Sequence, residues 1–439
     1  MSGMGWEVML SLMGGLLVVL MGIGVPVAFA FLALNLAGAY LILGGESGLR
    51  LLALSTTEAV TSFSLVPIPL FILMGEILLH TGLATRAIHA IERLIAGVPG
   101  RLSLVAVVSG GVFASLSGSS IANTAVLGRV LLPEMLRLGY HPLLSIGPIL
   151  AIGGVAMLIP PSALAVLFGS LAGISISKLL LAGIVPGIIL AALFFIFIVA
   201  VSRLRPDLAP AQPEETEPFR ARWRPFLIYV LPLMIIVIVV VGSILSGIAT
   251  PTESAALGSI ATVLVAACYR SLSWKVISKA LSGTAATTAT IFIIISGSIA
   301  FSQILSFSGT TRQLVAVVTS MDIEIGTLVL MMLLVALLLG MLMDQISIML
   351  ITLPFFMPLI NLGGVDPIWF GVMMLIALEV GLITPPFGLL LFIMQSVAPE
   401  GVTMRQILSS ITPYIGIEIF GLFLIFAFPA LALWLPGFM

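Results

Sequence analysis

A serine-rich stretch inside a long apolar run is the first feature with the chemistry of a binding site. Residues 115–124 read SLSGSSIANT, which places four serines, an asparagine and a threonine in one short segment. Hydroxyl oxygens, together with carbonyl groups freed at a helix break, suit a hard cation such as Na⁺. Small residues for close helix packing are the alternative explanation. These polar side chains exceed what packing needs, so we predict site residues at Ser117, Gly118, Ser119, Ser120 and Asn123.

The second half of the chain carries a matching polar segment. Residues 344–347 read DQIS within an otherwise apolar stretch. An acidic side chain at such a depth in a membrane is a candidate functional residue, because its burial is costly. Asp344 could instead pair with Asn123 or a basic side chain, or lie nearer the membrane interface. We predict that Asp344 and Gln345 belong to the site.

Two proline pairs follow these polar segments. Residues 159–162 read IPPS and residues 384–388 read TPPFG, each inside an apolar run. Proline has no backbone N–H, so a pair of prolines breaks the helix and leaves carbonyl oxygens free. We therefore expect one Na⁺ site in each half, where a polar tip faces a broken helix. The predicted Na⁺ ligands are Ser117, Gly118, Ser120, Pro160, Ser162, Asp344, Thr384 and Pro385.

Four further acidic residues lie in apolar surroundings: Glu76, Glu253, Glu379 and Glu418. Glu253 follows Thr250, and this spacing is typical of a helix-capping box. Glu379 precedes Pro385 by six residues and could line the same cavity. Functional and structural roles stay open for Glu76 and Glu418. The sequence carries no phosphate-binding loop, serine-hydrolase motif or zinc-ligand spacing, so it gives no sign of an enzyme.

The composition shows what surrounds these residues. The chain has 439 residues, of which 60% are hydrophobic and 8% are charged. A soluble domain has about 25% charged residues, so this chain is predicted to be an all-α polytopic membrane protein. A net charge of −1 argues against nucleic-acid binding. One cysteine, Cys268, excludes an intramolecular disulfide, and we interpret it as a small buried residue.

The chain is predicted to contain two repeats. A shift of 225 positions places Pro133 on Pro358, Pro142 on Pro367 and both prolines of the first pair on those of the second. A polar linker with five arginines, residues 202–225, separates the repeats. We therefore divide the chain into residues 1–201, the linker 202–225 and residues 226–439.

Paired helix breaks are typical of secondary transporters, whose binding sites lie where broken helices meet. On this interpretation, the apolar segments beside residues 117–120 are too short to span and form a re-entrant hairpin. A second hairpin would have its tip near Asp344. A duplication that retains only packing symmetry is the alternative.

Four motifs resemble those of one family, the large membrane subunit (M subunit) of tripartite ATP-independent periplasmic (TRAP) transporters. They are 69–76 (PLFILMGE), 117–124 (SGSSIANT), 159–162 (IPPS) and 247–253 (GIATPTE). The resemblance extends over essentially the whole chain. Asn123 is a departure, because the family pattern leads us to expect an acidic residue there.

The resemblance implies an elevator-type fold of the ion-transporter superfamily, with inverted repeats, two hairpins and a moving transport domain. It implies a multi-pass protein of the bacterial inner membrane that imports an organic anion, such as a carboxylate, using a Na⁺ gradient. The implied partners are a small four-helix membrane subunit, expected as a separate chain, and a periplasmic substrate-binding protein. The alternatives are a stand-alone Na⁺-coupled anion carrier of the same superfamily and an integral-membrane enzyme, for which we find no polar catalytic cluster.

The five arginines of the linker predict its location, because basic loops stay in the cytoplasm. In a variant that lacks Cys268, a cysteine at position 213 should therefore resist a membrane-impermeant maleimide added to intact cells. The same cysteine should react in inside-out vesicles. Labelling of intact cells would place the linker in the periplasm.

Overall fold

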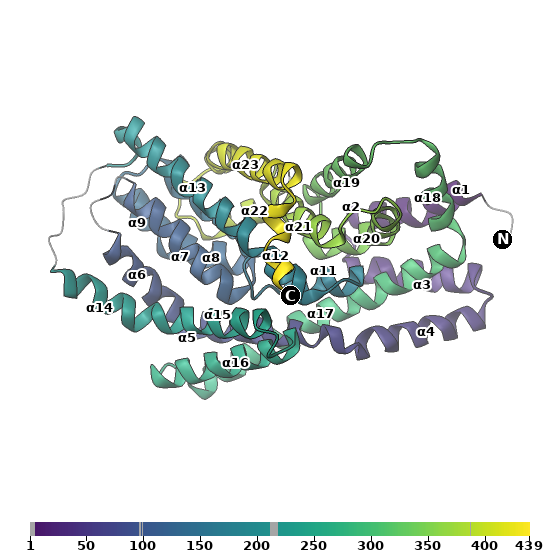
Figure 1. The fold of residues 1–439 in the computed structure, drawn as a ribbon, viewed down its shortest axis with the longest axis horizontal. Helices are drawn as coiled ribbons and strands as arrows, with labels where there is room; N and C mark the ends of the chain where they lie inside the picture. Colours follow the sequence, from purple (N-terminus) through teal and green to yellow (C-terminus); the bar gives the residue numbers. More distant parts are fainter. Residues whose placement is uncertain (1–4, 96–97, 99, 211–217, 387) are drawn as a thin grey trace.

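The computed structural model describes residues 5–95, 98, 100–210, 218–386 and 388–439. Over these residues the chain is helical, without a β-strand. Figure 1 shows an elongated bundle in which helices from both halves of the chain meet in the middle. The all-α architecture predicted from the composition is confirmed.

One group of helices forms a frame along the bundle. The frame helices are α3 (Val27–Ile42), α4 (Glu46–Thr61), α5 (Pro67–Thr81), α15 (Leu231–Leu245), α16 (Pro251–Cys268) and α17 (Trp274–Phe307). Helix α17 packs against α3, α4 and α5, while α16 packs against α5 and α15. Large apolar side chains such as Leu54, Leu264 and Ile293 are exposed on them, as expected of helices that face lipid. Cys268 is exposed too, so our interpretation of it as a buried residue is wrong.

Both predicted hairpin turns occur. Helix α7 (Arg101–Ser117) ends at Gly118, whose φ of 58° is left-handed, and α8 (Ser120–Val130) begins two residues later. Helix α19 (Ile325–Gly340) is followed by α20 (Gln345–Leu362), which Asp344 caps. Each pair packs together. The turns lie at residues 117–120 and near Asp344, as the sequence predicted.

Both proline pairs break helices. Helix α10 (Pro142–Val155) ends before the first pair, and α11 (Ala163–Ala172) begins after it. Helix α21 (Pro367–Ile383) ends before the second pair, and α22 (Leu389–Val397) follows. The predicted breaks are therefore confirmed.

The remaining helices connect and cover these elements. They are α1 (Trp6–Leu10), α2 (Leu16–Gly22), α6 (Leu83–Leu94), α9 (Leu132–Arg137), α12 (Ile176–Ala182), α13 (Ile184–Leu204), α14 (Phe219–Tyr229), α18 (Thr310–Ser320), α23 (Met404–Ala427) and α24 (Ala430–Leu433). Helices α6 and α18 hold corresponding places, each between a frame helix and a hairpin. Each follows a left-handed glycine, Gly82 or Gly309. The order of elements thus matches in the two halves, while their inverted orientation stays a prediction.

Length and apolar composition single out six helices of the described chain that could span a membrane, or seven if the bent pair of α14 and α15 counts as one. Seven shorter apolar helices accompany them. From its apolar runs, the sequence predicts about 11 spanning helices and two re-entrant hairpins, and this number stays a prediction. The linker boundaries are also untested, since positions 211–217 lie outside the described residues, although α13 and α14 extend into both ends of 202–225.

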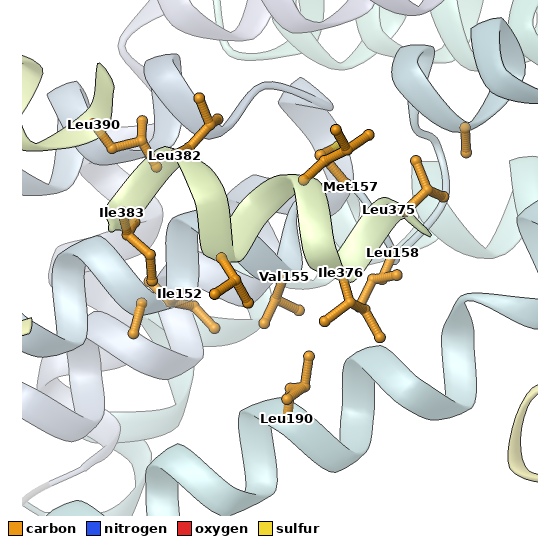
Figure 2. Close-up of a cluster of buried hydrophobic side chains, with 14 of the residues drawn as sticks. Ile152, Val155, Met157, Leu158, Leu190, Leu375, Ile376, Leu382, Ile383 and Leu390 are labelled. Atoms are coloured by element: carbon orange, nitrogen blue, oxygen red, sulfur yellow. The ribbon is translucent and has the colours of Figure 1, made fainter. Parts of the chain in front are cut away.

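Helices α10 and α21 form the centre of the packed interior. Both are buried along nearly their whole length. Figure 2 shows Ile152 and Val155 of α10 together with Ile376 and Ile383 of α21, next to Leu190 of α13. These helices belong to different halves of the chain, so the core forms only when the two halves come together.

Helix α21 also approaches α19 closely. A Cβ added at Gly381 would lie 2.6 Å from the Cα of Gly340, and a Cβ added at Gly340 would lie 2.7 Å from the Cα of Gly381. The neighbouring atoms belong to rigid backbone, so a side chain at either position would force the helices apart. The second hairpin is therefore fixed to the core by a pair of glycines.

We expect Gly381→Ala to destabilise the protein by about 1–3 kcal/mol, the typical cost of overpacking. The measurement is the free energy of unfolding in detergent. Gly242→Ala in α15 is the matched control, because a Cβ there has no neighbour within 4 Å. Equal stability of the two variants would contradict the close approach of α19 and α21.

Candidate functional site at the hairpin tips

The two hairpin tips share one cavity of about 250 Å³. The first tip contributes residues 117–122 and the second contributes residues 344–346. The frame closes the other side through Gly75 and Glu76 of α5 and Thr287 of α17. Polar segments from opposite halves of the chain thus converge on one space, as expected for a binding site.

Serine side chains organise the first tip. Ser119 caps α8 by accepting a hydrogen bond from the Ala122 N–H at 3.3 Å. Ser120 is buried, and its hydroxyl donates to the Oε1 atom of Glu379 on α21. The Ser117 Oγ lies 3.5 Å from the backbone nitrogen of Ser119. The tip is therefore attached to the core by Ser120, while Ser117 and Ser119 face the cavity.

Asp344 has a structural role at the second tip. Its carboxylate caps α20 by accepting from the Ser347 N–H at 3.1 Å, and it also accepts from the Ser347 hydroxyl. The predicted alternative of a bond to Asn123 does not occur, since the side-chain amide of Asn123 donates to the carbonyls of Gly110 and Ile152. Asp344 remains half-buried and lines the cavity.

Five predicted site residues lie outside the cavity lining: Asn123, Pro160, Ser162, Thr384 and Pro385. Ser162 caps α11 by accepting from the Ala165 N–H at 3.2 Å. The Thr384 hydroxyl donates to the Val380 carbonyl. The side chains of Ser162 and Thr384 thus form hydrogen bonds with backbone groups at the two helix breaks. The first break still meets the first tip, because a Cβ on Gly118 would lie 3.0 Å from the Pro161 carbonyl oxygen.

The cavity contains polar residues that the sequence did not single out as ligands. Glu76 lines it and pairs with His80 at 3.2 Å. Thr287 lies on α17 within a threonine-rich segment, 284–290, which is the signal that could have indicated it. Glu253, in contrast, forms a capping box with Thr250, so the structural interpretation of that residue is confirmed.

Nearly the whole chain matches one known family. Residues 15–431 match the family model "Tripartite ATP-independent periplasmic transporter, DctM component". The chain belongs to this family. This DctM-family chain is therefore a transporter subunit of the bacterial inner membrane, not an enzyme.

Relatives of known name cover nearly the same length. The chain is 32% identical to the C4-dicarboxylate TRAP transporter large permease protein DctM of Pseudomonas aeruginosa, covering 93% of this chain and 94% of the relative. It is 33% identical to the 2,3-diketo-L-gulonate large permease protein YiaN of Escherichia coli, covering 95% of each. It is 28% identical to the sialic acid large permease protein SiaM of Vibrio cholerae, covering 94% of this chain and 95% of the relative.

Two solved transporter structures share the fold. The YdaH transporter of Alcanivorax borkumensis superimposes with a TM-score of 0.64 at 16% identity, covering 93% of this chain and 96% of YdaH. MtrF of Neisseria gonorrhoeae gives 0.60 at 14% identity, covering 91% of this chain and 93% of MtrF. At such low identity the likeness concerns the fold alone.

The frame touches the first tip at Gly75. A Cβ added there would lie 2.8 Å from the Ser117 carbonyl oxygen. We expect Gly75→Ala to push the tip away from α5 at a cost of about 1–3 kcal/mol and to reduce the initial rate of uptake by this DctM-family chain. Gly111→Ala in the same hairpin has no neighbour within 4 Å and should leave uptake unchanged. Equal uptake rates for the two variants would show that the contact between Gly75 and the first tip does not affect transport.

Proposed function

We propose that this chain is the conducting subunit of a Na⁺-coupled importer of an organic anion. The supporting observation is the charge of the cavity. Asp344 and Glu76 line it, and no lysine or arginine is found among its described lining residues. An anion entering this cavity would be repelled unless a cation bound with it. Coupling to Na⁺ supplies that cation.

The two hairpin tips supply further attraction for an anion. Helices α8 and α20 both begin at the cavity, at Ser120 and Gln345. Helix N-termini carry partial positive charge and free N–H groups, which favour carboxylate binding. The proposed substrate therefore lies between the tips, with its carboxylate toward the helix starts.

The proposed Na⁺ ions bind beside the tips, one in each half. In the first half the ligands are oxygen atoms of Ser117, Gly118 and Ser120 and of the break that contains Pro160 and Ser162. The Ser120 hydroxyl donates a hydrogen bond to Glu379. The lone pairs of the Ser120 oxygen therefore stay available for a cation. In the second half, Asp344, Thr384 and Pro385 supply the ligands. Oxygen atoms from unwound backbone bind a hard cation without requiring many buried charges.

The names of the relatives suggest substrates for testing. C4-dicarboxylates, 2,3-diketo-L-gulonate and sialic acid are all organic acids. We infer a carboxylate substrate for this chain as well. The proposed partners are a small membrane subunit and a periplasmic binding protein, which captures the substrate and delivers it to the cavity.

Reconstitution of the chain with these two partners tests the proposal. Uptake of a panel of carboxylates into proteoliposomes should require both an inward Na⁺ gradient and the binding protein. Uptake without the binding protein would favour a stand-alone Na⁺-coupled carrier. Uptake driven by a proton gradient without Na⁺ would refute the proposed coupling ion.

Substitutions at the tips test the ion ligands. We expect Ser120→Ala and Asp344→Ala to weaken the apparent Na⁺ affinity of uptake roughly five- to hundredfold, by analogy with a lost buried hydrogen bond of about 1–3 kcal/mol. Asp344→Asn is the matched variant, because asparagine also caps helices but carries no charge. If Asp344 binds Na⁺, Asp344→Asn should weaken Na⁺ affinity while stability stays close to wild type. Wild-type Na⁺ affinity in both Ser120→Ala and Asp344→Asn would refute these ligands.

A further inference from the structure

Two glutamates lie side by side in the core behind the first hairpin tip. Glu379 belongs to α21 and Glu418 to α23, and each is only 2% exposed. Ser120 satisfies the Oε1 atom of Glu379. The Oε2 atom of Glu379 and both carboxylate oxygens of Glu418 have no hydrogen-bond partner. Three acidic oxygen atoms are thus buried without a donor.

The two carboxylates meet at Gly154 of α10. A Cβ added to Gly154 would lie 3.1 Å from the Oε1 atom of Glu418 and 3.6 Å from the Oε2 atom of Glu379. The 225-residue shift places Gly154 on Glu379, so α10 and α21 approach each other at equivalent positions. At this pair of equivalent positions, the first half of the chain has Gly154 and the second half has Glu379. A side chain at position 154 would contact both carboxylates.

These carboxylates need positive charge. Burying a carboxylate is costly unless a cation or several hydrogen bonds compensate it. The ion pairs found in the described part of the chain join other residues: His80 to Glu76, His89 and Arg101 to Glu92, and Arg137 to Glu134. None of these basic side chains reaches Glu379 or Glu418. Their charge must therefore be neutralised by a proton or by a bound cation.

A polar connection leads from the carboxylates to the cavity. Ser120, which binds Glu379, lines the cavity at the first tip. Gln345 lines it at the second tip, is only 8% exposed, and has a side-chain nitrogen without a hydrogen-bond partner. Its side chain approaches Glu379. A buried polar side chain at the second tip thus lies near Glu379.

We propose that Glu379 and Glu418 form an additional Na⁺ site, behind the two sites at the hairpin tips. The inference rests on the proposed Na⁺ coupling. Carboxylate oxygens are suitable ligands for a hard cation, and Gly154 places no side chain against them. A Na⁺ ion here would compensate one of the two carboxylate charges and hold Glu379 in place. Because Glu379 binds Ser120, occupancy of this site stabilises the first tip in its substrate-binding position.

Equilibrium binding of ²²Na⁺ to the purified full-length chain tests the proposal without a known substrate. Glu418→Gln removes the charge at a residue that does not touch the hairpin tips. We expect it to bind one Na⁺ ion fewer per chain than wild type. Gly154→Ala should weaken the binding of the same ion at least severalfold, because the added methyl group would contact both carboxylates without changing their charge. Glu400→Gln, at an exposed glutamate between α22 and α23, is the matched control and should bind as wild type does.

Thermal unfolding provides a second readout. In Na⁺-free buffer, Glu418→Gln should unfold at a higher temperature than wild type, because an uncompensated buried charge has been removed. Addition of NaCl, with KCl as the ionic-strength control, should then stabilise this variant less than wild type.

The possible failures are distinguishable. If wild type binds Na⁺ and Glu418→Gln binds the same number of ions, the additional site does not exist, while the proposed coupling stands. If wild type binds no Na⁺, the proposed function itself fails. If Glu418→Gln cannot be purified in a folded state, unchanged Na⁺ binding by Gly154→Ala overturns the additional site, and weakened binding supports it.

Discussion

Hydrocarbon offers no hydrogen-bond partner to a free backbone group, and this constraint shapes the whole molecule. The chain interrupts its helices between α7 and α8, α10 and α11, α19 and α20, and α21 and α22. Each interruption must therefore be satisfied within the protein. Ser119, Ser162 and Asp344 cap three of the four new helix starts. The dense burial of α10 and α21 keeps the interruptions away from lipid, so the packed core is a precondition of the site.

The same constraint gives the polar residues two kinds of role. Ser162, Thr384 and Asn123 direct their polar groups at backbone atoms nearby, and they stabilise the breaks. Other polar groups, on residues 117–120 and 344–345, remain at the cavity. A polar residue near a helix break is thus no proof of a ligand, because repairing the backbone requires the same residue types. Ser119 and Asp344 do both, since each caps a helix and also lines the cavity.

Sequence reasoning located the breaks but not the contacts across them. Proline pairs and a serine-rich segment disrupt helices through local chemistry, so the turns at residues 117–120 and the ends of α10 and α21 could be predicted. The bond between Ser120 and Glu379 joins residues 259 positions apart, and no local pattern indicates it. Glu418 looked like any other acid in an apolar run for the same reason. Its position opposite Gly154 depends on how α10, α21 and α23 pack.

Charge balance connects the cavity to the core behind it. The Asp344 carboxylate repels an anion at the cavity, whereas the starts of α8 and α20 attract one. Glu379 and Glu418 are buried deeper inside without a basic partner among the ion pairs of the described residues, and the proposed Na⁺ ion would bind there. In the proposed cycle, cations that bind first would cancel the repulsion and hold Ser120 through Glu379, so the anion would meet a completed site. A cavity of this composition binds an anion poorly when empty of cations, and this electrostatic penalty would prevent the substrate from moving without its coupling ions.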